Sequence, residues 1–147
     1  MSDFFHKLPE FVGNHPWLSA LFAILVVALI VGEILRLAQK FKSINPSEVT
    51  LLINRENALV VDISPHANFE QGHIPGSRHV AMSQFDPENK NLAKARDLPI
   101  VVVCRTGQTA KGAAQRLVKA GFTRVHILHG GMHSWRQANM PMATGKR

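Results

Sequence analysis

The pattern of hydrophobic and polar positions separates an N-terminal apolar segment from a longer region of short, alternating runs. Residues 17–32 read WLSALFAILVVALIVG and carry no charged side chain. Extended to Leu35, this segment gives a helix of about 28 Å, close to the roughly 30 Å hydrocarbon core of a bilayer. A soluble amphipathic helix would show a polar face, whereas only Ser19 and Glu33 interrupt the apolar pattern. The pattern predicts one transmembrane helix at about residues 17–35.

The flanks of this segment favour an uncleaved anchor over a secretory signal peptide. A signal peptide needs a positive N-terminal region and small residues at its cleavage site. Here Lys7 is balanced by Asp3 and Glu10, and no convincing cleavage site follows. Basic residues follow the segment at Arg36, Lys40 and Lys42. The positive-inside rule therefore predicts a single-pass protein of the inner membrane with its C-terminal domain in the cytoplasm.

Beyond the apolar segment, short β-branched runs alternate with helical periodicity. We expect strands at 58–63, 77–80, 99–104 and 125–128. We expect helices at 46–54, 66–71, 87–96 and 132–138, and one between the turn at 105–108 and Gly121. Buried strands that alternate with helices indicate a parallel sheet covered on both faces, so the predicted fold class is α/β. We divide the chain into an N-terminal segment, 1–40, and a single domain, 43–147.

One helix start is marked especially clearly. Asn45 is a favourable capping residue, Pro46 occupies the first helical position, and Glu48 follows the cap by three residues. This spacing is typical of a capping box, in which two side chains satisfy the free backbone N–H groups of the first turn. We therefore expect a helix to begin at Pro46.

Composition and charge narrow the classes of function. Hydrophobic residues make up 46% of the 147 residues, which is typical of a folded chain. The net charge is +7, and because only Lys7 is basic before Arg36, the excess lies in the C-terminal region. Such a charge attracts nucleic acid, anionic lipid or small anions. The sequence has no aromatic interleaving, zinc-finger spacing or dense Lys/Arg run, so we expect an anionic ligand or the membrane surface, and no nucleic acid.

Cys104 is the candidate nucleophile. It is the one cysteine of the sequence, so it cannot form an internal disulfide and is compatible with a reducing compartment. It ends a predicted strand and precedes a helix, at the edge of a parallel sheet where ligands bind. The loop that follows consists of Arg105, Thr106, Gly107, Gln108 and Thr109.

This loop can surround the sulfur of Cys104 with backbone N–H groups. Gly107 permits the backbone angles that such a loop needs, and Arg105 adds a cation. The N-terminus of the following helix adds a positive partial charge. Together these features favour a thiolate, and the same loop suits a persulfide or an oxyanion such as thiosulfate.

Two alternatives compete with a sulfur-carrying thiol. Cys104 can be a buried structural residue, since free cysteine is often a small core residue. The loop also resembles that of Cys-x5-Arg phosphatases, which clamp phosphate with an Arg six residues after the cysteine. That position holds Ala110 here, Arg105 lies too early and Arg116 lies well down the helix. The pattern argues against phosphatase chemistry.

The histidines near the C-terminus suggest a metal site at first sight. They are His126, His129 and His133. The predicted strand, Gly-Gly turn and helix spread them around a turn, and no cysteine or acidic residue lies among them. We therefore expect no metal and no cofactor.

Three segments together resemble the signatures of single-domain rhodaneses. They are VVDISPHANFEQGHIPGS at 60–77, VCRTGQTAKGAAQRL at 103–117 and GGMHSWRQANMP at 130–141. They follow the family's order and, with the helix before them, span about 45–141. The preceding apolar segment resembles the anchor of membrane-bound bacterial members. The resemblance implies a rhodanese-like α/β domain. We expect Trp135 to lie in its core and the run from Gly72 to Gly76 to form a structural turn.

The resemblance also implies a function. A rhodanese-type sulfurtransferase takes sulfane sulfur from a small anionic donor such as thiosulfate and holds it as a persulfide, here on Cys104. The sulfur then passes to cyanide in the test tube, or to a thiol or a protein acceptor in the cell. In this interpretation the residues from Arg105 to Thr109 bind the substrate, and Asp62 either orients that loop or caps a turn.

Two departures from the family pattern leave a second function open. Family members commonly have Arg at the position of Ser64, and many carry Arg late in the active-site loop, where Gln108 and Thr109 stand here. Both changes weaken the case for efficient use of thiosulfate. The alternative is a membrane-tethered rhodanese-like module that binds or regulates a partner with little catalysis.

Overall fold

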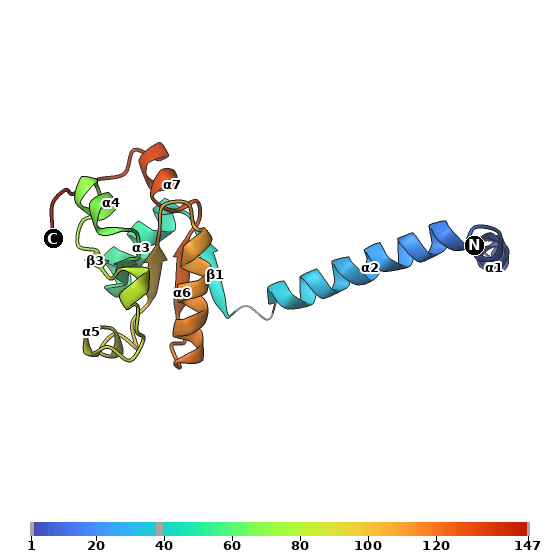
Figure 1. The fold of residues 1–147 in the computed structure, drawn as a ribbon, viewed down its shortest axis with the longest axis horizontal. Coiled ribbons are helices and arrows are strands. Elements are labelled where there is room, and N and C mark those ends of the chain that lie inside the picture. The colour runs from blue at the N-terminus through green and yellow to red at the C-terminus, as the bar shows by residue number, and fades with distance from the viewer. Residues whose placement is uncertain (1, 38–39, 147) are drawn as a thin grey trace. The chain divides into compact units, whose positions relative to one another are not determined.

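The computed structural model describes residues 2–37 and 40–146. By its contacts the chain divides into two compact units, Met1–Gln39 and Lys40–Arg147. The first unit contains two helices, and the second contains a sheet with helices around it (Figure 1).

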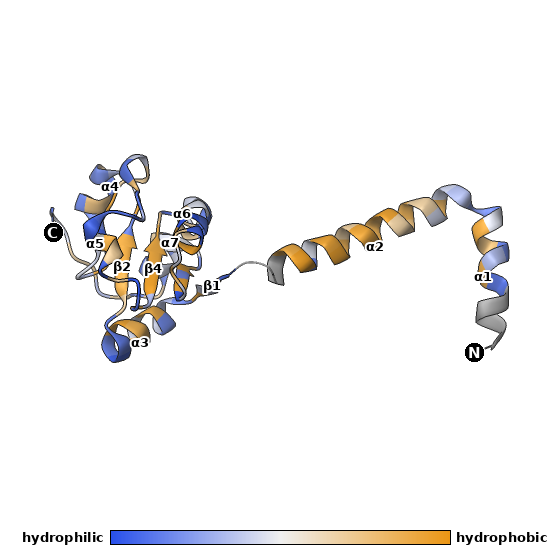
Figure 2. Ribbon diagram, turned by 90° about the horizontal axis from the view of Figure 1, so that it is seen from below, coloured by the Kyte–Doolittle hydropathy of each residue, from blue (hydrophilic) through white to orange (hydrophobic). Residues whose placement is uncertain are grey.

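The N-terminal unit consists of α1 (Ser2–Asn14) and α2 (Pro16–Leu37). Figure 2 shows α2 as apolar along most of its length. Its large apolar side chains include many that are exposed, with Trp17 89% exposed and Leu29 74% exposed. Over Pro16–Leu35 it is long and apolar enough to cross a membrane, and no other helix in the described ranges is. The sequence analysis did not predict α1, which contains Pro9 in its interior.

The second unit is built on a five-stranded parallel sheet with strand order β1-β5-β4-β2-β3. The strands are β1 (Phe41–Ile44), β2 (Leu59–Asp62), β3 (Arg78–His79), β4 (Ile100–Val103) and β5 (Val125–Leu128). Every side chain of the central strand β4 is buried, because helices cover both faces of the sheet (Figure 1). The predicted α/β fold class is therefore confirmed.

Two apolar layers enclose this sheet. One face packs against α6 (Gln108–Lys119) and α5 (Lys90–Ala93), with Leu117 and Leu92 in its core. The other packs against α3 (Pro46–Glu56) and α7 (Gly131–Gln137), with Val49 and Trp135 in its core. Side chains alternate along β4, so Val102 joins the first layer and Val103 joins the second. The short elements α4 (His66–Gln71) and η1 (Met82–Gln84) connect the strands at one end of the sheet.

The start of α3 follows the predicted capping box. The Asn45 side chain accepts a hydrogen bond from the Glu48 backbone N–H at 2.9 Å, and the Glu48 carboxylate accepts one from the Asn45 N–H at 2.8 Å. Gly121 follows the end of α6 with φ +95°, as expected of a C-terminal glycine. Local sequence signals therefore determine where α3 starts and where α6 ends.

Other elements differ from expectation in extent. The sequence analysis predicted no strand at β1, where only Phe41 and Ile44 face the core, while Lys42 and Ser43 are exposed. The helix expected at 87–96 forms only over Lys90–Ala93, and β3 has only two residues. The remaining predicted strands and helices are present, with ends shifted by a few residues.

Candidate functional site

Cys104 directly follows β4, the strand that lies between β5 and β2. Cys104 is only 4% exposed, and its sulfur accepts a hydrogen bond from the Gly107 backbone N–H at 3.0 Å. Gly107 caps α6 with φ +90°, a left-handed conformation that glycine adopts without strain. The turn after β4 thus bends back so that the Gly107 N–H faces the sulfur.

The N-terminus of α7 holds this turn from the other side. The Met132 N–H donates to the Cys104 carbonyl at 2.8 Å, and the His133 N–H donates to the Arg105 carbonyl at 3.2 Å. A Cβ on Gly131 would collide with the Cys104 carbonyl oxygen and the Arg105 backbone. Sequence reasoning missed this role of Gly131, although the Gly130-Gly131 pair before a helix was a signal for close backbone approach.

A cavity of about 400 Å³ opens in front of Cys104. It brings together four of the predicted site residues, Cys104, Arg105, Thr106 and Thr109. Gly107 and Gln108 instead line a separate cavity, with Lys111 and His129 among their neighbours. Gly107 therefore meets the sulfur through its backbone alone, while the structure does not place Gln108 in the cavity with Cys104.

The opposite wall of this cavity comes from two segments that sequence reasoning did not assign to the site. They are Ile63-Ser64-Pro65, after β2, and Ala81-Met82-Ser83, after β3. Their positions directly after strands could have indicated this, because the carboxyl ends of neighbouring parallel strands lie at the same edge of a sheet. Most of these residues are apolar, so the wall facing Cys104 is largely apolar.

Asp62 is buried at the end of β2, next to the site. Its Oδ1 accepts hydrogen bonds from the Ser64 backbone N–H at 2.9 Å and from the Ser64 hydroxyl. Its Oδ2 is buried and has no hydrogen-bond partner in the described part of the chain. Among the described residues, the hydrogen bonds of Asp62 thus hold the turn that carries Ser64 into the cavity wall, rather than the loop at 105–109.

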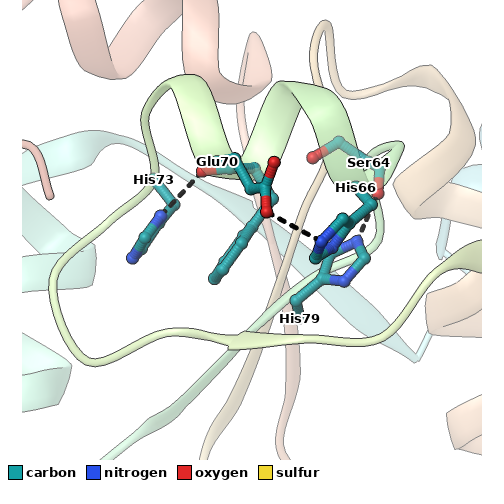
Figure 3. Close-up of polar contacts among 6 residues, drawn as sticks. Ser64, His66, Glu70, His73 and His79 are labelled. Carbon is teal, nitrogen blue, oxygen red and sulfur yellow. Dashed lines mark hydrogen bonds and ion pairs between the residues drawn. The ribbon is translucent and has the colours of Figure 1, made fainter. Parts of the chain in front are cut away.

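Residues in and around α4 support the cavity wall that contains Ser64. His79 Nε2 donates to the Ser64 carbonyl at 2.7 Å, as Figure 3 shows. In the same view His66 pairs with Glu70 at 3.0 Å, and His73 Nδ1 donates to the Phe69 carbonyl at 2.8 Å. The Phe69 and His73 rings stack with centroids 3.8 Å apart. These contacts give the run from Gly72 to Gly76 a structural role.

The three C-terminal histidines lie in different surroundings. His126 is on β5, His129 Nδ1 is 3.3 Å from the Ser43 hydroxyl, and His133 is exposed on α7. Burial lowers the pKa of His126 below its ordinary 6.5, and the positive charges of Arg124 and Lys42 lower it further. Within residues 2–37 and 40–146, no group of three or more His, Cys, Asp or Glu side chains is arranged to hold a metal.

Comparison with known sequences gives relatives over most of the chain. Residues 45–138 match the rhodanese-like domain. The chain is 38% identical over 141 residues to a protein of Escherichia coli strain K12 called "Uncharacterized protein YibN", covering 95% of this chain and 99% of that protein. It is also 35% identical over 98 residues to the thiosulfate sulfurtransferase GlpE of Pseudoalteromonas translucida, covering 67% of this chain and 91% of GlpE.

Solved structures share the fold described above. A rhodanese-related protein from Thermoplasma volcanium superposes with a TM-score of 0.61 at 23% identity, covering 71% of this chain and 99% of that one. A thiosulfate sulfurtransferase from Pseudomonas aeruginosa gives a TM-score of 0.64 at 26% identity, covering 71% of this chain and 20% of that one. Taken with the sequence relatives and the cysteine-bearing turn after β4, they establish that the chain belongs to the rhodanese-like family.

Proposed function

We propose that this chain is a sulfurtransferase that carries sulfane sulfur as a persulfide on Cys104. The observation that carries the proposal is the position of the Cys104 sulfur, which lies at a cavity and accepts the Gly107 N–H at 3.0 Å. A backbone donor at this position stabilises a sulfur anion, whether thiolate or persulfide. Relatives named thiosulfate sulfurtransferase support the same chemistry at the level of the family.

The reaction divides into two displacements at sulfur. The Cys104 thiolate attacks the outer sulfur of thiosulfate, and the sulfur–sulfur bond breaks with its electron pair leaving on sulfite. The product is a Cys104 persulfide. An acceptor thiolate, or cyanide in the test tube, then attacks the outer sulfur of the persulfide, and Cys104 leaves as a thiolate. The cycle is redox-neutral and needs no cofactor.

The residues of the loop take distinct parts in this proposal. Arg105 adds a positive charge to the cavity and assists capture of an anionic donor. Thr106 and Thr109 offer hydroxyl groups to the oxygens of that donor. Gly107 supplies the N–H that faces the sulfur. We include Gln108 through its backbone only, because Gln108 lines another cavity and not the one at Cys104.

Mass spectrometry of the full chain tests the proposal. The protein, purified in a neutral detergent, is incubated with thiosulfate and its mass is compared before and after. We expect the wild type to gain one sulfur atom and a Cys104→Ser variant to gain none. Sulfur that remains on the Cys104→Ser variant, or a wild type that never gains sulfur from thiosulfate or an organic persulfide, contradicts the proposal.

A membrane-tethered binding or regulatory module is the second candidate. It is favoured by the apolar wall opposite Cys104, where Ser64 provides no cation to hold thiosulfate. This candidate predicts that Cys104→Ser leaves the biological role of the protein intact. Complementation of a deletion strain by the Cys104→Ser variant, with any phenotype of that strain as the readout, therefore distinguishes the two.

A further inference from the structure

A second cavity, of about 150 Å³, adjoins the cavity of Cys104. The two share Ser64, Arg105 and Thr106, so a ligand in one lies beside a ligand in the other. The remaining residues of the second cavity come from the α4 region and from α7, and include His133 and Arg136.

This second cavity is cationic. Arg105, Arg136 and His133 line it, and no described lining residue is acidic. Neither arginine forms an ion pair among the described residues, whereas Arg124 pairs with Glu56 elsewhere on the domain. The two guanidinium groups thus remain available to an external anion.

Backbone contacts hold the two arginines near one another. The His133 N–H donates to the Arg105 carbonyl at 3.2 Å and so ties the first turn of α7 to the loop after Cys104. A Cβ on Gly72 would lie 3.4 Å from Arg136 Nη2, so the guanidinium group passes close to a position without a side chain. The hydrogen bond that ties α7 to the Cys104 turn therefore also joins the two segments that bring Arg105 and Arg136 to this cavity.

We propose that the second cavity binds the carboxylate of a small organic thiol whose sulfur reacts at Cys104. This rests on the proposed sulfur transfer and names its acceptor class. The carbon chain of such a thiol suits the adjoining cavity, whose wall includes Ile63, Pro65 and Met82. In the transfer step the thiolate attacks the outer sulfur of the persulfide and the Cys104 thiolate leaves, while the carboxylate stays bound between Arg105 and Arg136.

Thiol–disulfide exchange tests the subsite without requiring a persulfide. The full chain in neutral detergent reacts with dithiodipropionate or with hydroxyethyl disulfide, which share a two-carbon arm but end in a carboxylate or a hydroxyl. Cys104 attacks either reagent and releases one thiol, and mass spectrometry follows the mixed disulfide. We expect Arg136→Gln to lower the ratio of the carboxylate rate to the hydroxyl rate about tenfold.

The matched control is Arg116→Gln. Arg116 is exposed in the last turn of α6, as Arg136 is in the last turn of α7, and its loss changes the net charge equally. We expect the control to keep the wild-type ratio. An unchanged ratio in Arg136→Gln, or an equal fall in both variants, overturns the subsite. Because Arg136 is exposed, its loss leaves the core intact.

A second experiment links the subsite to sulfur transfer. Protein loaded with persulfide reacts with mercaptopropionate or mercaptoethanol, and Arg136→Gln should lower the ratio of these two rates in the same way. If no persulfide forms while the disulfide ratio falls as expected, the subsite stands and the proposed function fails. If persulfide forms and the disulfide ratio does not respond to Arg136→Gln, the proposed function stands and the subsite is refuted.

Discussion

At the scale of single residues, the position of Cys104 depends on glycines more than on charged side chains. Gly107 donates its N–H to the sulfur from a left-handed conformation, and Gly131 lets α7 approach the Cys104 carbonyl. Neither glycine has a side chain that could take part in the chemistry. Their contribution is to let backbone groups come closer than any side chain would allow.

Gly107→Val should impair the site through its backbone. A β-branched residue resists φ +90°, at a cost of about 1–3 kcal/mol, and its Cβ would lie 3.3 Å from the Gly130 nitrogen. We expect a large loss of sulfur transfer with the overall fold retained. Steady-state kinetics with thiosulfate and cyanide, beside circular dichroism, measure both. Wild-type kinetics in this variant would refute the backbone role.

Arg105→Ala should act on donor capture instead. The side chain is exposed at the cavity and contributes a cation, which raises the local concentration of an anionic donor. We expect a higher KM for thiosulfate with a smaller change in kcat, and a weaker dependence of the rate on salt. A KM equal to that of the wild type at low salt would remove Arg105 from this role.

At the scale of elements, α7 is tied by its first turn to the loop after β4. Gly131→Ala should therefore destabilise the domain, because the new Cβ overlaps the Cys104 carbonyl and the Arg105 backbone. Such overpacking costs about 1–3 kcal/mol. Chemical denaturation measures the loss. In the matched variant Gly112→Ala the new Cβ meets only Met82 at 3.8 Å, so we expect a small stabilisation of α6.

His126 on β5 should make the stability of the domain sensitive to acid. Its pKa in the folded state is lowered by burial, so below pH 6.5 the unfolded chain binds a proton that the folded chain resists. The free energy of unfolding is then highest above pH 6.5, and it falls as the pH drops below that value. We expect His126→Val to reduce this slope. Urea denaturation at several pH values compares the wild type with His126→Val. An equal pH dependence of the free energy of unfolding in the two proteins would contradict the prediction.

The sequence predicted the elements whose own residues determine them. The apolar β-branched runs gave β2, β4 and β5, and the capping box gave the start of α3. It did not predict β1, because only Phe41 and Ile44 point to the core and the two residues between them are polar. An edge strand of this kind is determined by pairing with β5, which local pattern does not record.

The candidate site also has a part that the sequence predicted and a part that it did not. A cysteine between a strand and a helix is visible in the sequence, and so is the glycine that bends the turn. The opposite wall at Ile63–Pro65 and Ala81–Ser83 was not predicted, because β2 and β3 bring it to Cys104 across the sheet. The contact of Gly131 with Cys104 likewise joins residues distant in sequence.

At the scale of the whole molecule, an apolar helix precedes a domain with its own core. We predict that α2 anchors the protein in the inner membrane and that the domain faces the cytoplasm, because Arg36, Lys40 and Lys42 follow the apolar segment. Reporters fused to the C-terminus, one active in the cytoplasm and one outside it, test the orientation. Release of the protein by an alkaline wash, or activity of the outside reporter alone, would refute it.

Removal of residues 1–40 should leave a soluble, folded and active domain. The cut falls just before β1, and every residue assigned to sulfur transfer lies beyond it. We expect one cooperative unfolding transition and wild-type loading of Cys104 with sulfur. Aggregation of this fragment, or loss of sulfur loading in a folded fragment, would mean that the N-terminal segment contributes to the domain.

The hold of α7 on the Cys104 turn also has a consequence for the order of synthesis. The amides of Met132 and His133 that bind the Cys104 and Arg105 carbonyls belong to α7, which follows Cys104 in the chain after α6 and β5. A ribosome releases Cys104 and Arg105 before it releases these amides. The nascent protein therefore exposes its only thiol for a period in which the surrounding turn is unfinished. Chemistry at Cys104 in its described form starts only once α7 has been synthesised and its first turn has bound the Cys104 and Arg105 carbonyls.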